Sequence, residues 1–328
     1  MLQKDKRVLI CGVSGQDGSL LAKFLLELGN YEVWGTSRDA QISSFQNLKK
    51  LNIRDKVNLI SMSPTDFRSV LQGIEQAKPQ EIYYLAGQSS VGLSFQQPVE
   101  TLESLAFGTI NVLESIRFLD KTIKFYGAGS SECFGNIEGQ ADESVPFRPR
   151  SPYAVAKATA FWETVNYREA YDLYACSGIL FNHESYLRPE RFVTQKIIRS
   201  VCKIAQGKQE KLLIGNTNIR RDWGWATEYI QAMYLMLQRK TPEDYVIATG
   251  ASYSLQEFIE TAFYYFNLDW RKYVEVDQKL YRPADIFESR GNPNKAKTEL
   301  GWQAKYKMPD VVKMMIEANM RELNHEKF

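Results

Sequence analysis

The chain has 328 residues, which is long for one domain and comfortable for two. A hydrophobic content of 44% allows a sizeable core, and a formal net charge of +2 argues against a nucleic-acid-binding surface. The N-terminus is polar, and no stretch approaches the roughly 20 apolar residues of a membrane span. We expect a cytoplasmic protein without nucleic-acid or membrane partners.

The apolar runs and helical periods alternate along the first half of the chain. The predicted strands are 8–11, 31–36, 57–61, 81–85, 124–127 and 178–181, and the predicted helices between them include 19–28, 67–76 and 107–118. Continuous apolar runs are typical of strands buried on both faces. The alternation therefore predicts an α/β fold with a doubly wound parallel (Rossmann) sheet.

The alternation weakens after about residue 184, where Arg, Trp, Tyr and Pro become denser. We assign 1–184, together with about 223–252, to a dinucleotide-binding Rossmann domain. The segments at about 185–222 and 253–328 are assigned to a smaller C-terminal α/β substrate domain over the carboxyl edge of the sheet, where ligands bind. Its last stretch, 308–323, is predicted to be an amphipathic helix that packs on the core.

Cysteine and histidine usage narrows the chemistry. The four cysteines form no C-x-x-C pair, which favours reduced thiols over a disulfide framework or a zinc ribbon. The only histidines are His183 and His325, so a three-histidine metal site is excluded and no metal is expected.

A glycine-rich turn follows the first predicted strand and opens the first helix. Gly12, Gly15 and Gly18 have the spacing that allows a tight turn, close approach to a pyrophosphate, and close helix–strand packing. The helix N-terminus adds free N–H groups for phosphate oxygens. The alternative is an ordinary tight turn. The expected cofactor-binding residues here are Gly12, Ser14, Gly15, Gln16, Asp17 and Gly18, with Leu85 and Ala86 after the fourth strand.

The residues after the second strand bear on the choice of cofactor. An acidic residue at this place would hold the 2′-hydroxyl of NAD, whereas an arginine would hold the 2′-phosphate of NADP. The chain has both, as Arg38 and Asp39. Because Arg38 comes first, we favour NADP and keep NAD as the alternative.

Tyr153 and Lys157 are the predicted catalytic pair. Ser151 and Pro152 suit the N-cap and first position of a helix, which places Tyr153 and Lys157 four residues apart on one face. A nearby ammonium stabilises a phenolate and brings its pKa toward the working range. The alternative is a surface Tyr–Lys pair. The pair indicates hydride transfer between a nicotinamide dinucleotide and a substrate hydroxyl.

Ser130 and Glu132 follow the fifth predicted strand and so lie at the ligand edge of the sheet. Ser130 can hydrogen-bond a substrate hydroxyl. A simple alcohol dehydrogenase does not need the carboxylate of Glu132, but an enzyme that removes a carbon-bound proton does. The alternative role for Glu132 is capping of the following segment.

These residues resemble the extended short-chain dehydrogenases, and one branch closely: the GDP-mannose 4,6-dehydratases. The motifs Asn182-His-Glu-Ser185 and Arg221-Asp-Trp-Gly224 are specific to that branch. The matching stretches run in order through almost the whole chain, at 12–19, 149–157, 165–169, 178–185, 192–194, 221–224 and 247–250.

The resemblance implies a redox-neutral elimination on a GDP-linked sugar. Tyr153 takes the C4 hydroxyl proton as hydride leaves C4, Glu132 removes the C5 proton as water leaves C6, and the hydride returns to C6. Ser130 stands where the family has threonine. The implied substrate-binding residues are Ser89, Asn182, Glu184, Val193, Lys196, Arg221, Arg282 and Asp285. An alternative for Arg221 is a structural ion pair with Asp222 or Glu228, and His183 is expected to be structural.

The chain departs from the family pattern at several places. These are Asp39, Ser63, the 88–90 loop, Leu105, Trp225 and Asp285. They leave open another GDP-hexose or heptose as substrate. The competing functions are a related nucleotide-sugar reductase or epimerase and a non-catalytic redox sensor. The resemblance also implies a homodimer or homotetramer that associates partly through the loop at 39–51.

Overall fold

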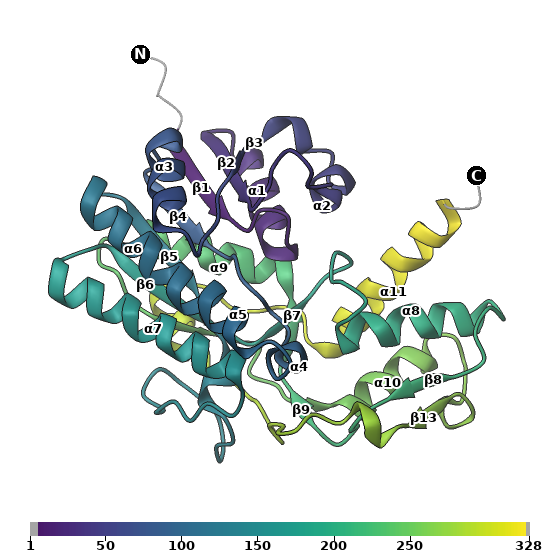
Figure 1. Cartoon of the computed structure of the whole chain (residues 1–328). Helices are drawn as coiled ribbons and strands as arrows, with labels where there is room; N and C mark the ends of the chain where they lie inside the picture. The colour runs from purple at the N-terminus through teal and green to yellow at the C-terminus, as the bar shows by residue number, and fades with distance from the viewer. Residues whose placement is uncertain (1–5, 326–328) are drawn as a thin grey trace.

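A computed structural model describes residues 6–325, so the polar start of the chain, residues 1–5, lies outside the described part. Its centre is a seven-stranded sheet in the order β11-β6-β5-β4-β1-β2-β3 (Figure 1). Every neighbouring pair in this sheet is parallel. The strand order reverses between β1 and β4, which is where a doubly wound sheet binds its ligands. The predicted fold class is confirmed.

The described chain contains the following elements. The sheet strands are β1 (Lys6–Cys11), β2 (Tyr31–Ser37), β3 (Asn58–Ser61), β4 (Glu81–Tyr84), β5 (Lys124–Ala128), β6 (Ala175–Leu180) and β11 (Tyr245–Ile247). Three further pairs are β7 (Asn182–Glu184) with β10 (Trp223–Trp225), β9 (Arg220–Arg221) with β12 (Tyr253–Ser254), and β8 (Leu212–Ile214) with β13 (Val274–Val276). The helices are α1 (Gln16–Leu28), α2 (Gln46–Lys50), α3 (Phe67–Ala77), α4 (Val91–Ser94), α5 (Pro98–Leu102), α6 (Gly108–Leu119), α7 (Pro152–Tyr171), α8 (Val193–Ala205), α9 (Ala226–Gln238), α10 (Leu255–Tyr264) and α11 (Met308–His325).

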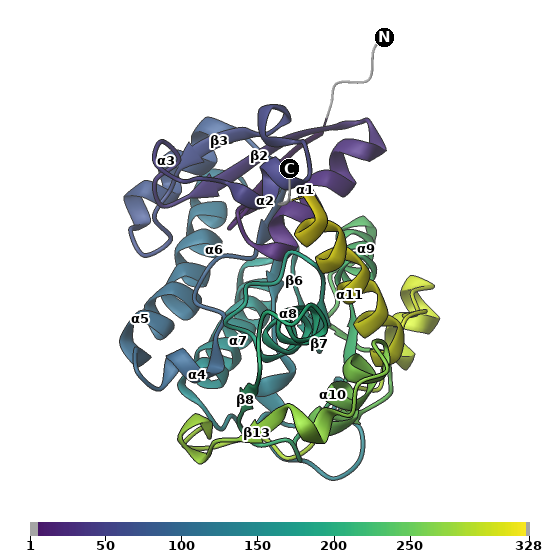
Figure 2. The ribbon, with the colours of Figure 1, turned by 90° about the vertical axis from the view of Figure 1, so that its right-hand side faces the viewer.

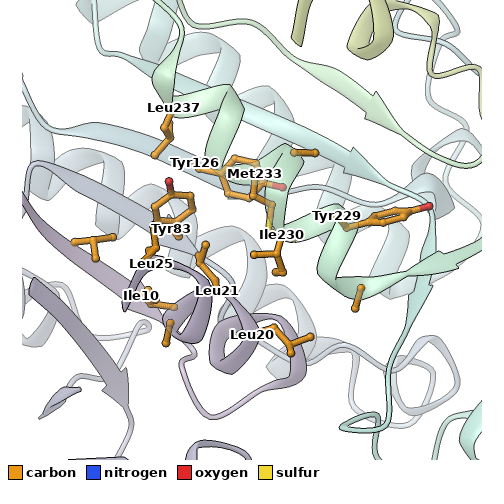
Figure 3. Close-up of a cluster of buried hydrophobic side chains, with 14 of the residues drawn as sticks. Ile10, Leu20, Leu21, Leu25, Tyr83, Tyr126, Tyr229, Ile230, Met233 and Leu237 are labelled. Atoms are coloured by element: carbon orange, nitrogen blue, oxygen red, sulfur yellow. The ribbon is translucent and has the colours of Figure 1, made fainter. Parts of the chain in front are cut away.

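Helices cover both faces of the sheet because successive strand residues point to opposite sides. Ile10 points to the face covered by α1 and α9, where it lies with Leu21 and Met233 (Figure 3). Leu9 points to the other face, where it packs with residues of α3, α6 and α7. The burial of β1 on both sides explains why its sequence is a continuous apolar run.

A second apolar core lies beside the sheet. It is formed by α8, α10, α11 and the β8/β13 pair, which the two ribbon views show together (Figures 1 and 2). Ile198, Phe258 and Val312 are among its fully buried members. Helix α11 supplies the apolar stripe that the sequence predicts.

The chain crosses between the two cores more often than the sequence suggests. Trp223 packs in the second core although 223–252 was assigned to the Rossmann domain. Trp302 packs in the first core, where its indole N–H donates to the carbonyl oxygen of Glu228 at 2.8 Å.

Strand β11 was not predicted, because its three residues follow a loop and carry little periodicity. None of the helices within residues 6–325 has the length and apolarity that crossing a membrane requires.

Candidate active site

The glycine-rich turn has the geometry that its spacing predicts. Gly12 has a φ of +85°, and an added Cβ would lie 2.9 Å from the backbone of Ala86. A Cβ on Gly18 would lie 2.4 Å from the carbonyl oxygen of Gly12, so both positions require glycine. Gly15 is exposed and caps α1 without a side-chain hydrogen bond. The turn therefore presents uncapped backbone N–H groups, which suit the pyrophosphate of a dinucleotide.

Side chains in the first turn of α1 tie this helix to β7. Gln16 is buried, accepts a hydrogen bond from the Ser185 hydroxyl at 2.9 Å, and donates to the carbonyl oxygen of His183 at 3.2 Å. Asp17 Oδ2 lies 2.9 Å from His183 Nε2. Burial opposes ionisation of Asp17, yet the neighbouring His183 cation holds the pKa of that carboxyl well below its usual range. Ser14 is exposed beside the same turn.

Ser130 and Glu132 occupy a short helical turn after β5. The hydroxyl oxygen of Ser130 accepts a hydrogen bond from the backbone N–H of Glu132 at 3.3 Å and so caps residues 131–134. The capping role considered for Glu132 therefore belongs to Ser130. The Glu132 carboxylate instead lies 3.8 Å from Nε of Arg221, and its side chain is 13% exposed.

Tyr153 and Lys157 lie at the start of α7, which Ser151 caps by accepting from the N–H of Ala154. The Lys157 ammonium donates to the carbonyl oxygen of Ala128 at 2.6 Å, and burial lowers the pKa of this lysine to about 8. Burial raises the pKa of Tyr153 above its ordinary value, while a hydrogen bond with Ser130 opposes the rise. Burial thus outweighs the Ser130 hydrogen bond and the charge of Arg188, both of which favour the phenolate.

Arg221 is the centre of a charged network. Its guanidinium is 5% exposed, lies 3.8 Å from Glu132, and donates to Asp285 at 3.0 Å. Arg282 approaches the same Asp285 oxygen at 3.6 Å. The alternative prediction, a structural ion pair of Arg221 with Asp222 or Glu228, is therefore wrong.

Both of those acids have other partners. Asp222 accepts from Thr249 and Gly250. Glu228 accepts from the backbone N–H groups of Lys305 and Tyr306. Arg221 is therefore held by Asp285 and by the carbonyl oxygens of Arg220 and Ile286, and not by the carboxylates of Asp222 or Glu228.

One cavity of about 360 Å³ brings most of the predicted site residues together. It lies along the carboxyl edge of the sheet and extends to the second core. The predicted residues that line it are Asp17, Leu85, Ala86, Ser89, Ser130, Glu132, Tyr153, Lys157, Asn182, Glu184, Val193, Lys196, Arg221, Arg282 and Asp285. The departures at the 88–90 loop and Leu105 line the same cavity.

The remaining predicted residues do not line this cavity. Most of them belong to the glycine-rich turn and the first turn of α1, on either side of Asp17 in the sequence: Gly12, Ser14, Gly15, Gln16 and Gly18. The Arg38 side chain is 82% exposed after β2, and its guanidinium lies 3.9 Å from Glu100. Asp39 turns back on its own loop and accepts from the N–H of Gln41 at 2.8 Å.

Arg188 is a site residue that the sequence reasoning missed. Its Nε donates to Glu184 at 2.7 Å, and its positive charge opposes the rise that burial causes in the pKa of Tyr153. It lines the cavity and stacks over Phe192, 4.7 Å from the ring centroid. Its position four residues after Glu184, just beyond a recognised motif, was the available signal.

The doubly wound sheet, the glycine-rich first turn and the Tyr153/Lys157 pair define the class of extended short-chain dehydrogenases. The family model "GDP-mannose 4,6 dehydratase" matches residues 9–315. The chain belongs to the GDP-mannose 4,6-dehydratase family.

Named relatives agree with this assignment. GDP-mannose 4,6 dehydratase 2 of Arabidopsis thaliana is 43% identical over 337 residues, covering 100% of this chain and 90% of that protein. GDP-mannose 4,6-dehydratase of Vibrio cholerae is 40% identical over 351 residues, covering 96% and 94%. The similarity therefore extends over both cores.

Solved structures share the fold at lower identity. A dTDP-glucose 4,6-dehydratase from Bacillus anthracis, in complex with NAD, has a TM-score of 0.84 at 18% identity and covers 96% of this chain and 97% of that one. RMD from Pseudomonas aeruginosa, complexed with NADPH, has a TM-score of 0.77 at 19% identity, with the same coverage.

Proposed function

We propose that the protein is a GDP-mannose 4,6-dehydratase, converting GDP-mannose to GDP-4-keto-6-deoxymannose. The observation that carries the proposal is that Glu132 shares one cavity with Ser130, Tyr153 and Lys157. The relatives at 40–44% identity bear the same activity in their names. Glu132 supplies the base that a dehydratase needs and a simple reductase does not.

The chain's own residues divide the chemistry among them. A nicotinamide dinucleotide, when bound, accepts hydride from C4 and returns it to C6. Tyr153 removes the C4 hydroxyl proton, aided by the hydrogen bond of Ser130 and the charge of Lys157. The resulting 4-keto group acidifies the C5 proton, which Glu132 removes while water leaves from C6. Since the hydride is returned, no external oxidant is needed.

Cationic side chains on the far side of the cavity suit a nucleotide diphosphate. Lys196, Arg221 and Arg282 line this side, and Asn182 adds an amide. Guanidinium groups bind phosphate oxygens through charge-assisted hydrogen bonds. Two further residues of the predicted substrate-binding set line the same cavity. Glu184 forms an ion pair with Arg188, and Val193 is the first residue of α8. We accordingly propose the second core as the main part of a nucleotide-sugar-binding domain and the sheet as the dinucleotide-binding domain.

NADP is the proposed form of the cofactor. The support comes from Arg38, whose side chain is 82% exposed, while Asp39 is engaged by its own loop. An arginine at this place favours the 2′-phosphate. Dissociation constants for NADP⁺ and NAD⁺, measured by fluorescence with the protein and with Arg38→Ala, test this. Preferential loss of NADP⁺ affinity is expected, and tighter binding of NAD⁺ by the unaltered protein would overturn the choice.

The experiment that tests the function follows product mass. Purified protein with GDP-mannose and catalytic NADP⁺ is expected to give a product that has lost one water, without net NADPH. Consumption of stoichiometric NADPH, or an isomer of unchanged mass, would point to a reductase or an epimerase instead. A panel of other GDP-hexoses and heptoses, with UDP- and CDP-sugars, then identifies the preferred substrate.

Activity is expected to fall as pH rises through about 8. Lys157 has its pKa lowered to about 8 by burial, so it is charged below that pH and neutral above it. A neutral lysine no longer supports the Tyr153 phenolate. Lys157→Arg keeps a charge at every accessible pH. The pH profile of kcat/KM for this variant, although lower, should therefore lack the falling limb near pH 8. Persistence of the limb would assign it to another group.

We also propose a cytoplasmic homodimer or homotetramer. The four cysteines are free and buried, as suits a reducing compartment. In the 39–51 loop, Ile42 is 84% exposed, which leaves an apolar side chain available to a second subunit. Light scattering on the purified protein tests the assembly, and a monomeric mass at micromolar concentration would overturn it.

A further inference from the structure

Both ring nitrogens of His183 face hydrogen-bond acceptors. Nδ1 lies 2.7 Å from the carbonyl oxygen of Phe181, and Nε2 lies 2.9 Å from Asp17 Oδ2. A carbonyl oxygen can only accept, and the other oxygen of Asp17 already accepts from Gln16 at 2.8 Å. A neutral imidazole has only one N–H to donate, so this geometry is satisfied by an imidazolium with two.

The surroundings make the charge of His183 consequential. Its side chain is 9% exposed and stacks on Tyr229 of α9, with ring centroids 4.6 Å apart. Asp17 faces it from α1. The other charged groups near this pair are Lys157 from α7 and the Glu184–Arg188 pair, which is joined at 2.7 Å. Arg188 also lowers the pKa of Asp17, but its guanidinium is hydrogen-bonded to Glu184, so His183 is the direct hydrogen-bonded counter-charge of Asp17.

Asp17 lies at a position where an unpaired carboxylate would be harmful. It is in the first turn of α1, whose exposed N–H groups suit a pyrophosphate. A second anion beside that place would repel the phosphates. The pairing with His183 removes this repulsion while leaving the helix N-terminus free.

We propose that His183 is a positioning residue, held as an imidazolium, that neutralises Asp17 and so allows an anionic dinucleotide to bind at α1. The same contact joins the glycine turn to β7, whose neighbouring residues Asn182 and Glu184 line the cavity. The inference rests on the proposed function for the identity of the anionic ligand. The protonation state of His183 does not depend on that function.

Protonation can be measured directly, because the chain has only two histidines. Nitrogen-15 NMR of the histidine-labelled protein, with His325→Gln to assign the signals, is expected to show two protonated nitrogens on His183 at neutral pH. One unprotonated nitrogen would overturn the proposal. Burial opposes the charged form, yet Asp17 raises the pKa of His183 above its ordinary value. The second ring proton of His183, and the stabilisation that the His183–Asp17 ion pair gives to the folded protein, should therefore be lost only as pH rises through that raised pKa.

The role in binding is tested with a pair of variants. His183→Gln keeps a neutral N–H donor toward Asp17 and removes the charge, so NADP⁺ affinity should fall about tenfold, as one partly buried carboxylate without its direct counter-charge near the phosphates implies. Asp17→Asn with His183→Gln removes both charges, and affinity should return to within about threefold. NADP⁺ affinity of the unaltered protein should also fall at high pH, and that dependence should be smaller in the double variant, in which Lys157 still titrates at about 8.

The outcomes separate this inference from the proposed function. A double variant as weak as His183→Gln, with thermal melting showing that both are folded, would reduce His183 to a packing role and overturn the proposal. If the unaltered protein bound no dinucleotide, the proposed function would fail, and the binding role of His183 would fail with it. If binding and rescue occurred but GDP-mannose were not dehydrated, only the assigned activity would fail.

Discussion

Glu132→Gln is expected to stop release of water from GDP-mannose while hydride transfer from C4 still occurs once per active site. The substitution keeps the shape of the side chain and the cap that Ser130 makes to residue 132. It removes the carboxylate that would take the C5 proton. Loss of a positioned general base costs roughly 10²–10⁴-fold in rate. Steady-state product mass and single-turnover absorbance of the reduced nicotinamide measure the two steps separately.

A second readout of Glu132 uses solvent deuterium. In D₂O the unaltered protein should form a product that carries solvent deuterium on C5, and Glu132→Gln should not. Glu138→Gln is the matched control, since Glu138 is an exposed glutamate six residues further along the same segment. Dehydration by Glu132→Gln within about tenfold of the unaltered protein would show that another group removes the proton.

Tyr153→Phe is expected to block the earlier step. The phenol oxygen is the only group that the substitution removes, and with it the hydrogen bond that Ser130 makes in this cavity. Since C4 cannot lose hydride without losing its hydroxyl proton, no reduced nicotinamide should appear in a single turnover. The expected fall in kcat is again roughly 10²–10⁴-fold, and KM should change much less.

The contrast between the two variants is the decisive measurement. Reduced nicotinamide should form in Glu132→Gln and be absent in Tyr153→Phe, which orders the two residues along the reaction. Tyr171→Phe, at the other end of α7, controls for loss of a tyrosine hydroxyl from that helix. Formation of reduced nicotinamide by Tyr153→Phe at the normal rate would contradict the role of the phenol.

Most strands of the sheet could be predicted from local sequence patterns. The strands β1 to β6 are buried on both faces or flanked by clear helical periods, so apolar runs and turn residues identify them. Helix α7 was predicted from its cap at Ser151, which the structure confirms. Strand β11 has only three residues, and its place at the sheet edge depends on pairing with β6 across 67 positions of sequence, from Gly178 to Tyr245.

The charged contacts of the site could not be predicted in this way. Arg221 pairs with Asp285, 64 positions further along the chain, and with Glu132, which precedes it by 89. Which acid a buried arginine meets is decided by how the second core sits against the sheet. The same applies to His183, whose charge depends on Asp17 at a separation of 166 residues. Residue types in a motif therefore predicted which groups belong to the site, but not their partners.

The interlaced path of the chain constrains how this protein can be cut or recombined. A fragment ending at residue 184 would contain the glycine turn and Tyr153, yet it would lack α9 and β11. Ile230 and Met233 of α9 complete the core over Ile10 and Leu21 (Figure 3). Without them that face of the sheet would be open to water, and the fragment should aggregate. The two cores are thus not exchangeable modules, and substrate preference in this architecture has to change by substitution within the cavity and not by swapping a contiguous segment.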